Sequence, residues 1–394
     1  MMSGCSQYDL LLPRRVVFGW GRRNELGPLA AELGRRAFLV TGSRTLQASG
    51  TVEAVTAQLR EAGVETVPIG QIAHEPEVQD VDATVARILE HRPGEGDLVI
   101  GLGGGSAIDL AKAVAALVTN RHGESVRDFL EGVGNGLTID QPTLPFLAVP
   151  TTAGTGSEAT KNAVISSYDP TFKKSLRSPR MVAAAVLIDP ELTVTVPASV
   201  TAATGMDAIT QLIESYISGR TQPFTRALCL EGLQRALPAI VTAVEQPTDR
   251  PAREAMSHAA FLSGMALANS GLGLAHGVAA ALGVHCRTPH GIACAVMLPA
   301  ALRVNRDVRR DDLAHLGRLL TDTDSNDPDV LADAFIEHIE SICSRVGIPR
   351  TLSQLGVERE QIAAIVPSSH GNSMRGNPTQ LTDDELTSLL EGML

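Results

Sequence analysis

The stretch that decides the fold is Asp97-Leu-Val-Ile-Gly-Leu-Gly103-Gly104-Gly105-Ser106-Ala-Ile-Asp109-Leu-Ala-Lys-Ala113. It predicts a buried strand that runs into three consecutive glycines and then into a helix. Because glycine has no Cβ, the backbone can approach a ligand closely there, and the helix start offers free N–H groups and a positive dipole end. The pattern predicts a site for the phosphates of a dinucleotide or a phosphosugar, although its spacing is not the GxGxxG fingerprint of the ordinary Rossmann fold.

A tight strand-to-helix turn without a ligand is the alternative interpretation of this cluster, because glycines also serve turn geometry alone. In the ligand-binding interpretation, the contacts to the cofactor come from Gly103, Gly104, Gly105 and Ser106. Asp109 either supports the first turn of the helix or contacts the same ligand.

A second cluster of glycines and hydroxyls, Pro150-Thr-Thr-Ala-Gly-Thr-Gly-Ser-Glu158, follows another apolar run. Hydroxyls and exposed amides at the carboxyl end of a strand suit the diphosphate and ribose of a cofactor that lies across the sheet edge. We therefore expect Thr151, Thr152 and Thr155 to contact the cofactor. The alternative is a Ser/Thr-rich loop with no ligand.

The rest of the first half alternates β-branched runs with helical stretches, which predicts a parallel sheet with crossover helices. Strands are expected at residues 36–41, 65–69, 97–101, 145–149 and 185–188, and helices at about 51–62 and 78–91. After about Pro197 the segments become long and helical. The predicted fold is an α/β dinucleotide-binding domain with a Rossmann-like parallel sheet over residues 1–195, followed by an all-helical domain over residues 196–394.

The composition places the chain among globular proteins and excludes several partners. A net charge of −11 argues against binding to nucleic acid or to an anionic membrane surface. The five cysteines include no CxxC pair, so their spacing indicates neither a disulfide framework nor a thiolate zinc site. With no basic-then-apolar leader and no run of about 18 apolar residues, we expect a cytoplasmic protein without a membrane partner.

Two pairs of polar residues stand out in the second half. Asp207 and Gln211 are four residues apart, on one face of a predicted helix. His276 and His290 are separated by a Gly/Pro break, so imidazoles from two elements can converge on one metal ion or substrate.

Four ordered motifs together resemble the iron-containing (group III) alcohol dehydrogenase family, over nearly the whole chain. They are Gly-Gly-Gly-Ser-Ala-Ile-Asp109, Pro-Thr-Thr-Ala-Gly-Thr-Gly-Ser-Glu158, Gly-Met-Asp207-Ala-Ile-Thr and His276…Thr-Pro-His290-Gly. The resemblance implies hydride transfer between NAD(P) and a small polar alcohol or aldehyde, in a cleft between the two domains. It also implies a divalent metal, iron or zinc, and assembly as a homodimer or larger homo-oligomer.

The metal ligands that the resemblance implies are Asp207, Gln211, His276 and His290, with His276 and His290 at the reaction centre. The family usually has a histidine where this chain has Gln211, and a carboxamide oxygen is a weaker donor than imidazole. We therefore expect weakened metal binding.

A second departure lies four residues after His276, where relatives often carry a further histidine and this chain has Ala280. His285 either supplies an imidazole to the active site or is a structural histidine. Its direction depends on Gly283, which we expect to interrupt the helix.

Three functions remain open at the level of sequence. In the favoured one, Asp207, His276 and His290 hold a metal with Gln211 or water as the fourth ligand. In the second, the chain resembles the maleylacetate reductases, and His276 and His290 polarise the carbonyl of an oxo acid without a metal. The third is a catalytically silent nucleotide-binding protein.

The choice of nicotinamide cofactor depends on the end of the first long strand. Relatives that prefer NAD often have an Asp there, which repels a 2′-phosphate, whereas this chain has Gly42, Ser43 and Arg44. Arg44 can bind the phosphate by charge-assisted hydrogen bonds, so NADP(H) is favoured over NAD(H). Lys174 corresponds to a lysine that often contacts the cofactor, although the adjacent Lys173 leaves the register open.

Overall fold

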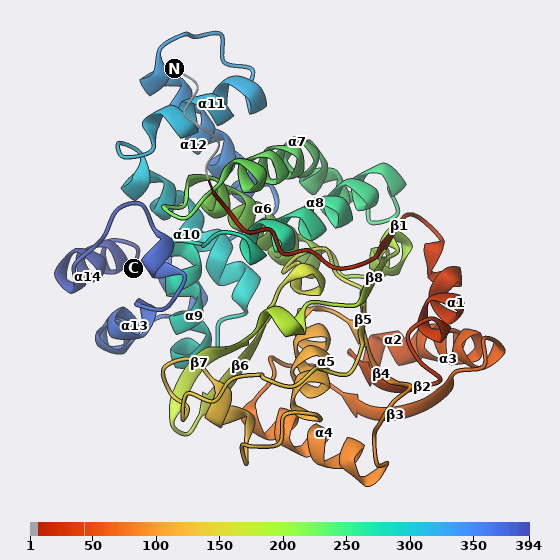
Figure 1. Ribbon diagram of the computed structural model, residues 1–394. Coiled ribbons are helices and arrows are strands. Elements are labelled where there is room, and N and C mark those ends of the chain that lie inside the picture. Colours follow the sequence, from red (N-terminus) through yellow and green to blue (C-terminus); the bar gives the residue numbers. More distant parts are fainter. Residues whose placement is uncertain (1–6, 43) are drawn as a thin grey trace. The chain divides into compact units, whose positions relative to one another are not determined.

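The structure, a computed structural model, describes residues 7–42 and 44–394, which form two compact units. The α/β unit comprises Leu11–Thr152 and Gly156–Val194. The helical unit comprises residues 7–10, Ala153–Thr155 and Thr195–Leu394 among those described. Figure 1 traces the chain through both units.

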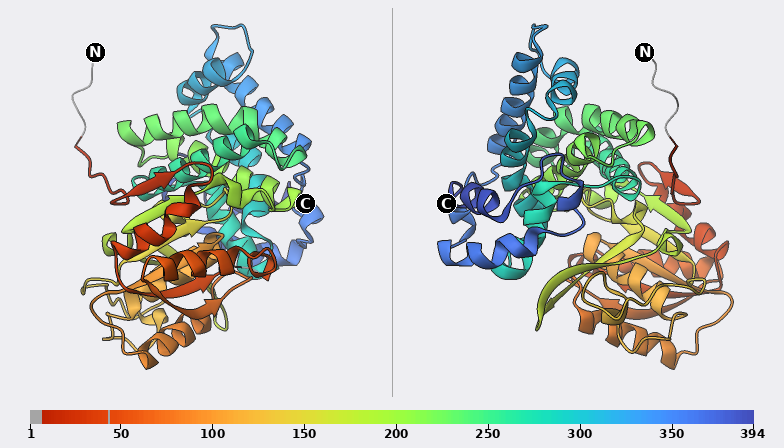
Figure 2. Two further views of the ribbon diagram at one scale, coloured as in Figure 1. Left: turned by 90° about the vertical axis from the view of Figure 1, so that its right-hand side faces the viewer. Right: turned by 60° about the vertical axis from the view of Figure 1, so that its left-hand side comes forward.

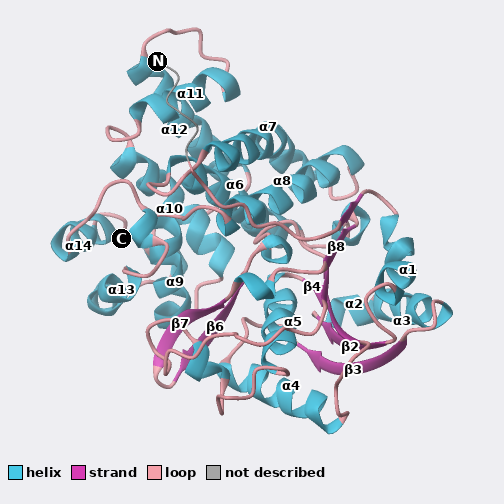
Figure 3. Cartoon of the chain, viewed as in Figure 1, coloured by secondary structure: helices cyan, strands magenta, loops and turns pink. Residues whose placement is uncertain are grey.

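A six-stranded sheet forms the centre of the α/β unit, and each pair of neighbouring strands in it is parallel (Figure 3). Its strand order is β1-β8-β5-β4-β2-β3. The strands are β1 (Val16–Phe18), β2 (Arg36–Thr41), β3 (Glu65–Gln71), β4 (Asp97–Gly103), β5 (Phe146–Pro150) and β8 (Ala185–Ile188). The predicted parallel sheet is confirmed, and β4 is buried along its whole length, as expected for a central parallel strand.

Crossover helices connect the strands of this sheet. They are α1 (Leu26–Ala31), α2 (Arg44–Ala48), α3 (Thr51–Glu61), α4 (Val78–Glu90) and α5 (Gly105–Leu117). A two-stranded antiparallel hairpin, β6 (Asn162–Tyr168) with β7 (Thr171–Arg177), follows β5 and was not expected from the sequence. Pro68 is tolerated inside β3 because β3 is the edge strand of the sheet.

The second half is all-helical, as predicted. Its helices are α6 (Ala198–Ile217), α7 (Pro223–Glu245), α8 (Arg250–Ala268), α9 (Leu274–Cys286), α10 (His290–Asn305), α11 (Arg310–Leu320), α12 (Pro328–Arg345), α13 (Ile362–Ser369) and α14 (Asp383–Glu391). In every view α11 and α12 lie side by side (Figure 2). The expectation that Gly283 interrupts a helix is wrong, because α9 continues through it to Cys286.

Small residues and aliphatic side chains form the core between these helices. Gly232 of α7 is one example, because a Cβ there would lie 2.7 Å from the side chain of Leu212 on α6. Among the described helices, α7 is the one long and apolar enough to cross a membrane. Cys229, Leu233 and Ile240 of α7 are fully buried in the core of the unit, and this burial accounts for its apolar composition.

Candidate functional site

Three helices of the helical unit bring four potential metal ligands together. Asp207 comes from α6, His276 from the first turn of α9, and His290 and Cys294 from the first two turns of α10. One ligand atom from each of these side chains lies within 4.8 Å of the others. Nε2 of His276 lies 3.2 Å from Oδ1 of Asp207, and Nε2 of His290 lies 4.0 Å from the same oxygen.

Burial and charge differ among the members of this cluster. Asp207 and His276 are buried, whereas the side chain of His290 keeps 27% of its surface exposed. Burial raises the pKa of Asp207, but the hydrogen bond with His276 and the charge of His290 outweigh it, and the pKa lies below its usual value. Burial lowers the pKa of His276, but Cys294, Asp207 and Glu214 outweigh it and hold the pKa well above its usual value. His290 is therefore the accessible member of the cluster.

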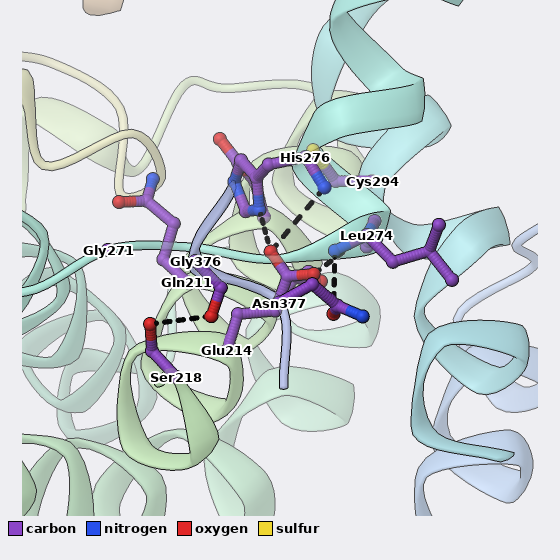
Figure 4. Close-up of polar contacts among 12 residues, drawn as sticks. Gln211, Glu214, Ser218, Gly271, Leu274, His276, Cys294, Gly376 and Asn377 are labelled. Carbon is purple, nitrogen blue, oxygen red and sulfur yellow. Dashed lines mark hydrogen bonds and ion pairs between the residues drawn. The ribbon is translucent and has the colours of Figure 1, made fainter. Parts of the chain in front are cut away.

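Glu214 contacts His276 at Nδ1 (Figure 4), whereas Asp207 lies at the other ring nitrogen, Nε2. Its Oε2 lies 2.7 Å from Nδ1 of His276, and its Oε1 accepts a 2.7 Å hydrogen bond from the backbone N–H of Ala275. Free N–H groups and a positive dipole end at the start of α9 stabilise a buried carboxylate in this position. Gly273 is required beside it, because a Cβ there would lie 2.8 Å from Oε1 of Glu214.

Sequence reasoning missed Glu214. A signal was present, because Glu214 follows Asp207 by seven residues, two helical turns, and therefore lies on the same face of α6. Cys294 was missed as well, although it follows His290 by one turn on α10.

Gln211 lies one turn after Asp207 on α6, and its carboxamide is buried. Its Nε2 donates a 3.0 Å hydrogen bond to the carbonyl of Thr155, and its Oε1 has no partner among the described residues. Leaving a buried acceptor unsatisfied costs about 1–3 kcal/mol. In the view of Figure 4 the carboxamide of Gln211 and the sulfur of Cys294 lie on opposite sides of the His276 ring.

The residues of the cluster fit a divalent transition metal. Two imidazoles and a carboxylate are ligands that zinc and iron share, and a thiolate or a carboxamide oxygen is available as a fourth. Asp207 and Glu214 are both buried beside one imidazole, which leaves surplus negative charge even when His276 is protonated. A cation would neutralise this charge, and buried charge is costly unless it is compensated.

His285 lies outside this cluster. It is in the last turn of α9, half-buried, with Nε2 2.7 Å from the hydroxyl of Ser368. Burial lowers its pKa. Ala280, one turn after His276, is half-buried on the same helix and places no polar group there.

The predicted cofactor loops of the α/β unit meet at the carboxyl ends of neighbouring strands. Gly42 follows β2 and donates its N–H to the carbonyl of Leu102, at 2.8 Å, and Thr151 follows β5 and donates to the carbonyl of Gly103, at 2.9 Å. The loops after β2, β4 and β5 therefore lie side by side. The backbones at Gly42 and Gly103 approach so closely that glycine is needed at both positions. A Cβ on Gly103 would lie 2.9 Å from the backbone nitrogen of Gly42, and a Cβ on Gly42 would lie 3.1 Å from Cα of Gly103.

The start of α5 is partly accessible at the same edge of the sheet. Gly104 is the N-cap residue, and Gly105 and Ser106 form the first turn, all three half-buried. A Cβ on Gly104 would lie 3.2 Å from the hydroxyl oxygen of Thr152. Gly104 and Thr152, both predicted to contact the cofactor, are therefore neighbours. Gly104, Gly105 and Ser106 place the N-terminal amides of α5 where a phosphate group can reach them.

Asp109 does not support the first turn of α5. Its carboxylate accepts hydrogen bonds from the hydroxyl of Ser157 and from the backbone N–H of Val164. Lys112 follows Asp109 by three residues on the same face of α5 and is buried. Its Nζ donates hydrogen bonds to the carbonyls of Ser157 and Asn162, at 2.6 and 2.7 Å. These two side chains hold the loop that follows β5 against α5.

The remaining residues that the sequence predicts as cofactor contacts are Ser43, Arg44, Thr155 and Lys174. Arg44 is the first residue of α2 and is exposed, whereas Ser43 lies outside the described residues. Lys173 forms an ion pair with Glu75, with Nζ 2.6 Å from Oε2. Successive side chains of a strand alternate between its faces, so Lys174 points to the other face of the hairpin. Thr155 belongs to the helical unit, where its carbonyl accepts the hydrogen bond from Gln211.

Comparison with known proteins gives matches over nearly the full length. The family model described as iron-containing alcohol dehydrogenase matches residues 13–190, and the model of the C-terminal part of the Fe-containing alcohol dehydrogenase family matches residues 201–394. Long-chain-alcohol dehydrogenase 1 of Geobacillus thermodenitrificans is 34% identical over 89% of each chain. NADPH-dependent butanol dehydrogenase of Clostridium saccharobutylicum is 31% identical over 96% of each.

Solved structures agree with this result. A 1,3-propanediol oxidoreductase superposes with a TM-score of 0.90 at 29% identity, and the match covers 99% of this chain and 100% of that one. A sulfoacetaldehyde reductase from Bifidobacterium kashiwanohense, in complex with NAD+, superposes with a TM-score of 0.86 at 29% identity, over 98% of this chain and 99% of the other.

Proposed function

The chain belongs to the iron-containing alcohol dehydrogenase family, and from this premise we propose that it interconverts a small polar alcohol and its aldehyde or ketone with NAD(P) and a divalent metal. The observation that carries the metal is the cluster of Asp207, His276, His290 and Cys294. Relatives named for butanol and lactaldehyde support substrates of this size.

The residues that would hold the ion are Asp207, His276 and His290, with a fourth ligand from the protein or from water. When bound, the ion supplies a Lewis acid that polarises the substrate oxygen. Glu214 accepts a hydrogen bond from Nδ1–H of His276 and so leaves Nε2, which faces Asp207, available as a ligand. His290, which keeps part of its surface exposed, marks the side from which the substrate reaches the cluster.

The α/β unit would bind the nicotinamide cofactor, which supplies or accepts the hydride. The N-terminal amides of α5 at Gly104, Gly105 and Ser106 would bind its pyrophosphate. Thr151 and Thr152 add hydroxyls from the neighbouring loop. Arg44, exposed at the start of α2, favours NADP(H) over NAD(H) through the 2′-phosphate.

A metal-free reductase fits the cluster less well. Both ring nitrogens of His276 face carboxylates, Nδ1 toward Glu214 and Nε2 toward Asp207. His276 therefore has no free N–H with which to polarise a carbonyl, and only His290 remains for that role. The surplus of buried negative charge also favours a cation.

The test is turnover with controlled metal content. Purified protein is stripped with a chelator and assayed with butanal, lactaldehyde and sulfoacetaldehyde, each with NADPH and with NADH. We expect turnover to disappear on stripping and to return with zinc or iron(II). Turnover by verified metal-free protein would contradict the metal-dependent function. Absence of turnover with any metal, cofactor and aldehyde would favour a catalytically silent nucleotide-binding protein.

A further inference from the structure

Cys294 is the member of the cluster to which neither the sequence motifs nor the family resemblance gives a role. It lies four residues after His290 on α10, so the two side chains share a helix face. Its Sγ lies 3.7 Å from Nε2 of His290, and the thiol is fully buried. The remaining ligand atoms, from Asp207 and His276, lie within 4.8 Å of this sulfur.

The distances within the cluster are close to those around a single tetrahedral ion. With metal bonds of about 2.0–2.2 Å to nitrogen and oxygen and about 2.3 Å to sulfur, two ligand atoms lie about 3.3–3.6 Å apart. The observed separations are 3.2 Å for His276 and Asp207, 3.7 Å for Cys294 and His290, and 4.0 Å for His290 and Asp207. These three separations need changes of about half an ångström to reach tetrahedral values, and the other pairs, all within 4.8 Å, need changes of up to about 1 Å.

Gln211 is the competing fourth ligand, and its contacts hold it elsewhere. The amide nitrogen is bound to the carbonyl of Thr155, which fixes the plane of the carboxamide. In the single view of Figure 4 this group and the sulfur of Cys294 are drawn on opposite sides of the His276 ring. The oxygen of a carboxamide is also a weaker donor for a transition metal than a thiolate.

We propose that Cys294 is the fourth protein ligand of the divalent ion, in the place of the histidine that Gln211 replaces, an inference that rests on the metal-dependent function proposed above. On binding, the thiol releases its proton to solvent and coordinates as thiolate. The two anionic ligands, Asp207 and the thiolate, then match the two charges of the ion, while Glu214, which is not a ligand, keeps its negative charge against Nδ1–H of His276. A soft sulfur ligand also favours zinc and cobalt(II) over iron(II).

Cobalt(II) is the probe that detects this bond, because a thiolate ligand gives an intense charge-transfer band in the near ultraviolet that imidazole and carboxylate do not give. We expect the band in the stoichiometric cobalt complex of the full chain. Cys294→Ser and Cys294→Ala remove the band and weaken zinc binding at least about tenfold, measured by chelator competition. The matched control is Cys286→Ser, at the half-buried end of α9 and outside the cluster, which keeps the band.

X-ray absorption of the zinc-loaded wild-type protein shows directly whether sulfur coordinates the metal. It needs no variant, so the test stands even if a Cys294 variant fails to fold. One sulfur at about 2.3 Å from zinc supports the assignment. A cobalt complex without the charge-transfer band, or zinc with only nitrogen and oxygen neighbours, would overturn the role of Cys294 while metal-dependent turnover still stands. If the protein binds neither cobalt nor zinc, the ligand role of Cys294 and the metal-dependent function are both wrong. Turnover by the metal-free protein would then show that the reaction itself needs no metal.

Discussion

Oε2 of Glu214 lies 2.7 Å from Nδ1 of His276, and the other oxygen of the same carboxylate accepts the backbone N–H of Ala275, one residue earlier. One carboxylate therefore fixes both the ring of His276 and the start of the helix that carries it. Glu214 contacts the candidate ligand rather than the site of the ion, so it is a positioning residue.

Glu214→Gln is expected to weaken zinc binding by about 10–100-fold, the usual cost of removing a hydrogen-bond partner of a metal-ligating histidine. The amide keeps the size of the side chain but removes the charge that makes the imidazole a stronger donor. Competition with a chromophoric chelator measures the affinity. Glu254→Gln, on α8 with the exposed Arg250 as its partner, is the control and should leave affinity unchanged. Unchanged affinity in folded Glu214→Gln would contradict the positioning role.

Gln211→His restores an imidazole to α6, and the size of its effect depends on whether Cys294 is already a ligand. We expect a gain in zinc affinity in the wild-type background and a gain at least about tenfold larger in the Cys294→Ser background, because residues that share one ion are not additive. Chelator competition on the four proteins of this cycle gives the coupling. Equal gains in both backgrounds would contradict competition between positions 211 and 294 for one coordination place.

The fold and three members of the cluster, Asp207, His276 and His290, could be predicted from the sequence, whereas Glu214 and Cys294 were missed. The strand, glycines and helix around Gly103 are consecutive in the chain, so apolar patterning and turn chemistry suffice for them. The hairpin of β6 and β7 was missed because Ser167 follows Ala163 and Ile165 in the apolar alternation of β6, and Lys174 stands between Phe172 and Leu176 in that of β7. Glu214 and Cys294 acquire their meaning only from the packing of α6 against α9 and α10, which brings together residues 62 or more positions apart.

Glu158 provides a pH-dependent test within the α/β unit. Burial raises the pKa of Glu158 to about 7 from its ordinary value of 4.5. A raised pKa means that the folded protein binds the proton more tightly than the unfolded chain, so this contribution to stability is complete below pH 4.5 and is lost as pH rises through about 7. Replacing the carboxyl with a neutral amide removes the effect.

Glu158→Gln should therefore match wild type near about pH 5 and exceed it in stability by about 2–3 kcal/mol near about pH 8. Urea unfolding of both proteins at several pH values measures the difference. Glu61→Gln, at an exposed position at the end of α3, is the matched control and should show no such divergence. A constant difference between Glu158→Gln and wild type across this range would show that Glu158 is ionised throughout.

Arg44 offers a direct test of cofactor preference. It is exposed at the first position of α2 and follows the strand end at Gly42, which approaches Gly103 at the edge where the cofactor loops meet. A guanidinium there can bind the 2′-phosphate of NADPH, and a hydrogen bond to a charged group contributes about 1.5–3 kcal/mol.

Arg44→Ala should therefore lower kcat/KM with NADPH by about 10–100-fold and change kcat/KM with NADH little. The matched control is Arg60→Ala, exposed at the end of α3 in the same unit, which should leave both values unchanged. An unchanged ratio of the two cofactors in Arg44→Ala would make Arg44 a solvated surface charge, and the preference for NADP(H) would then lose its physical basis.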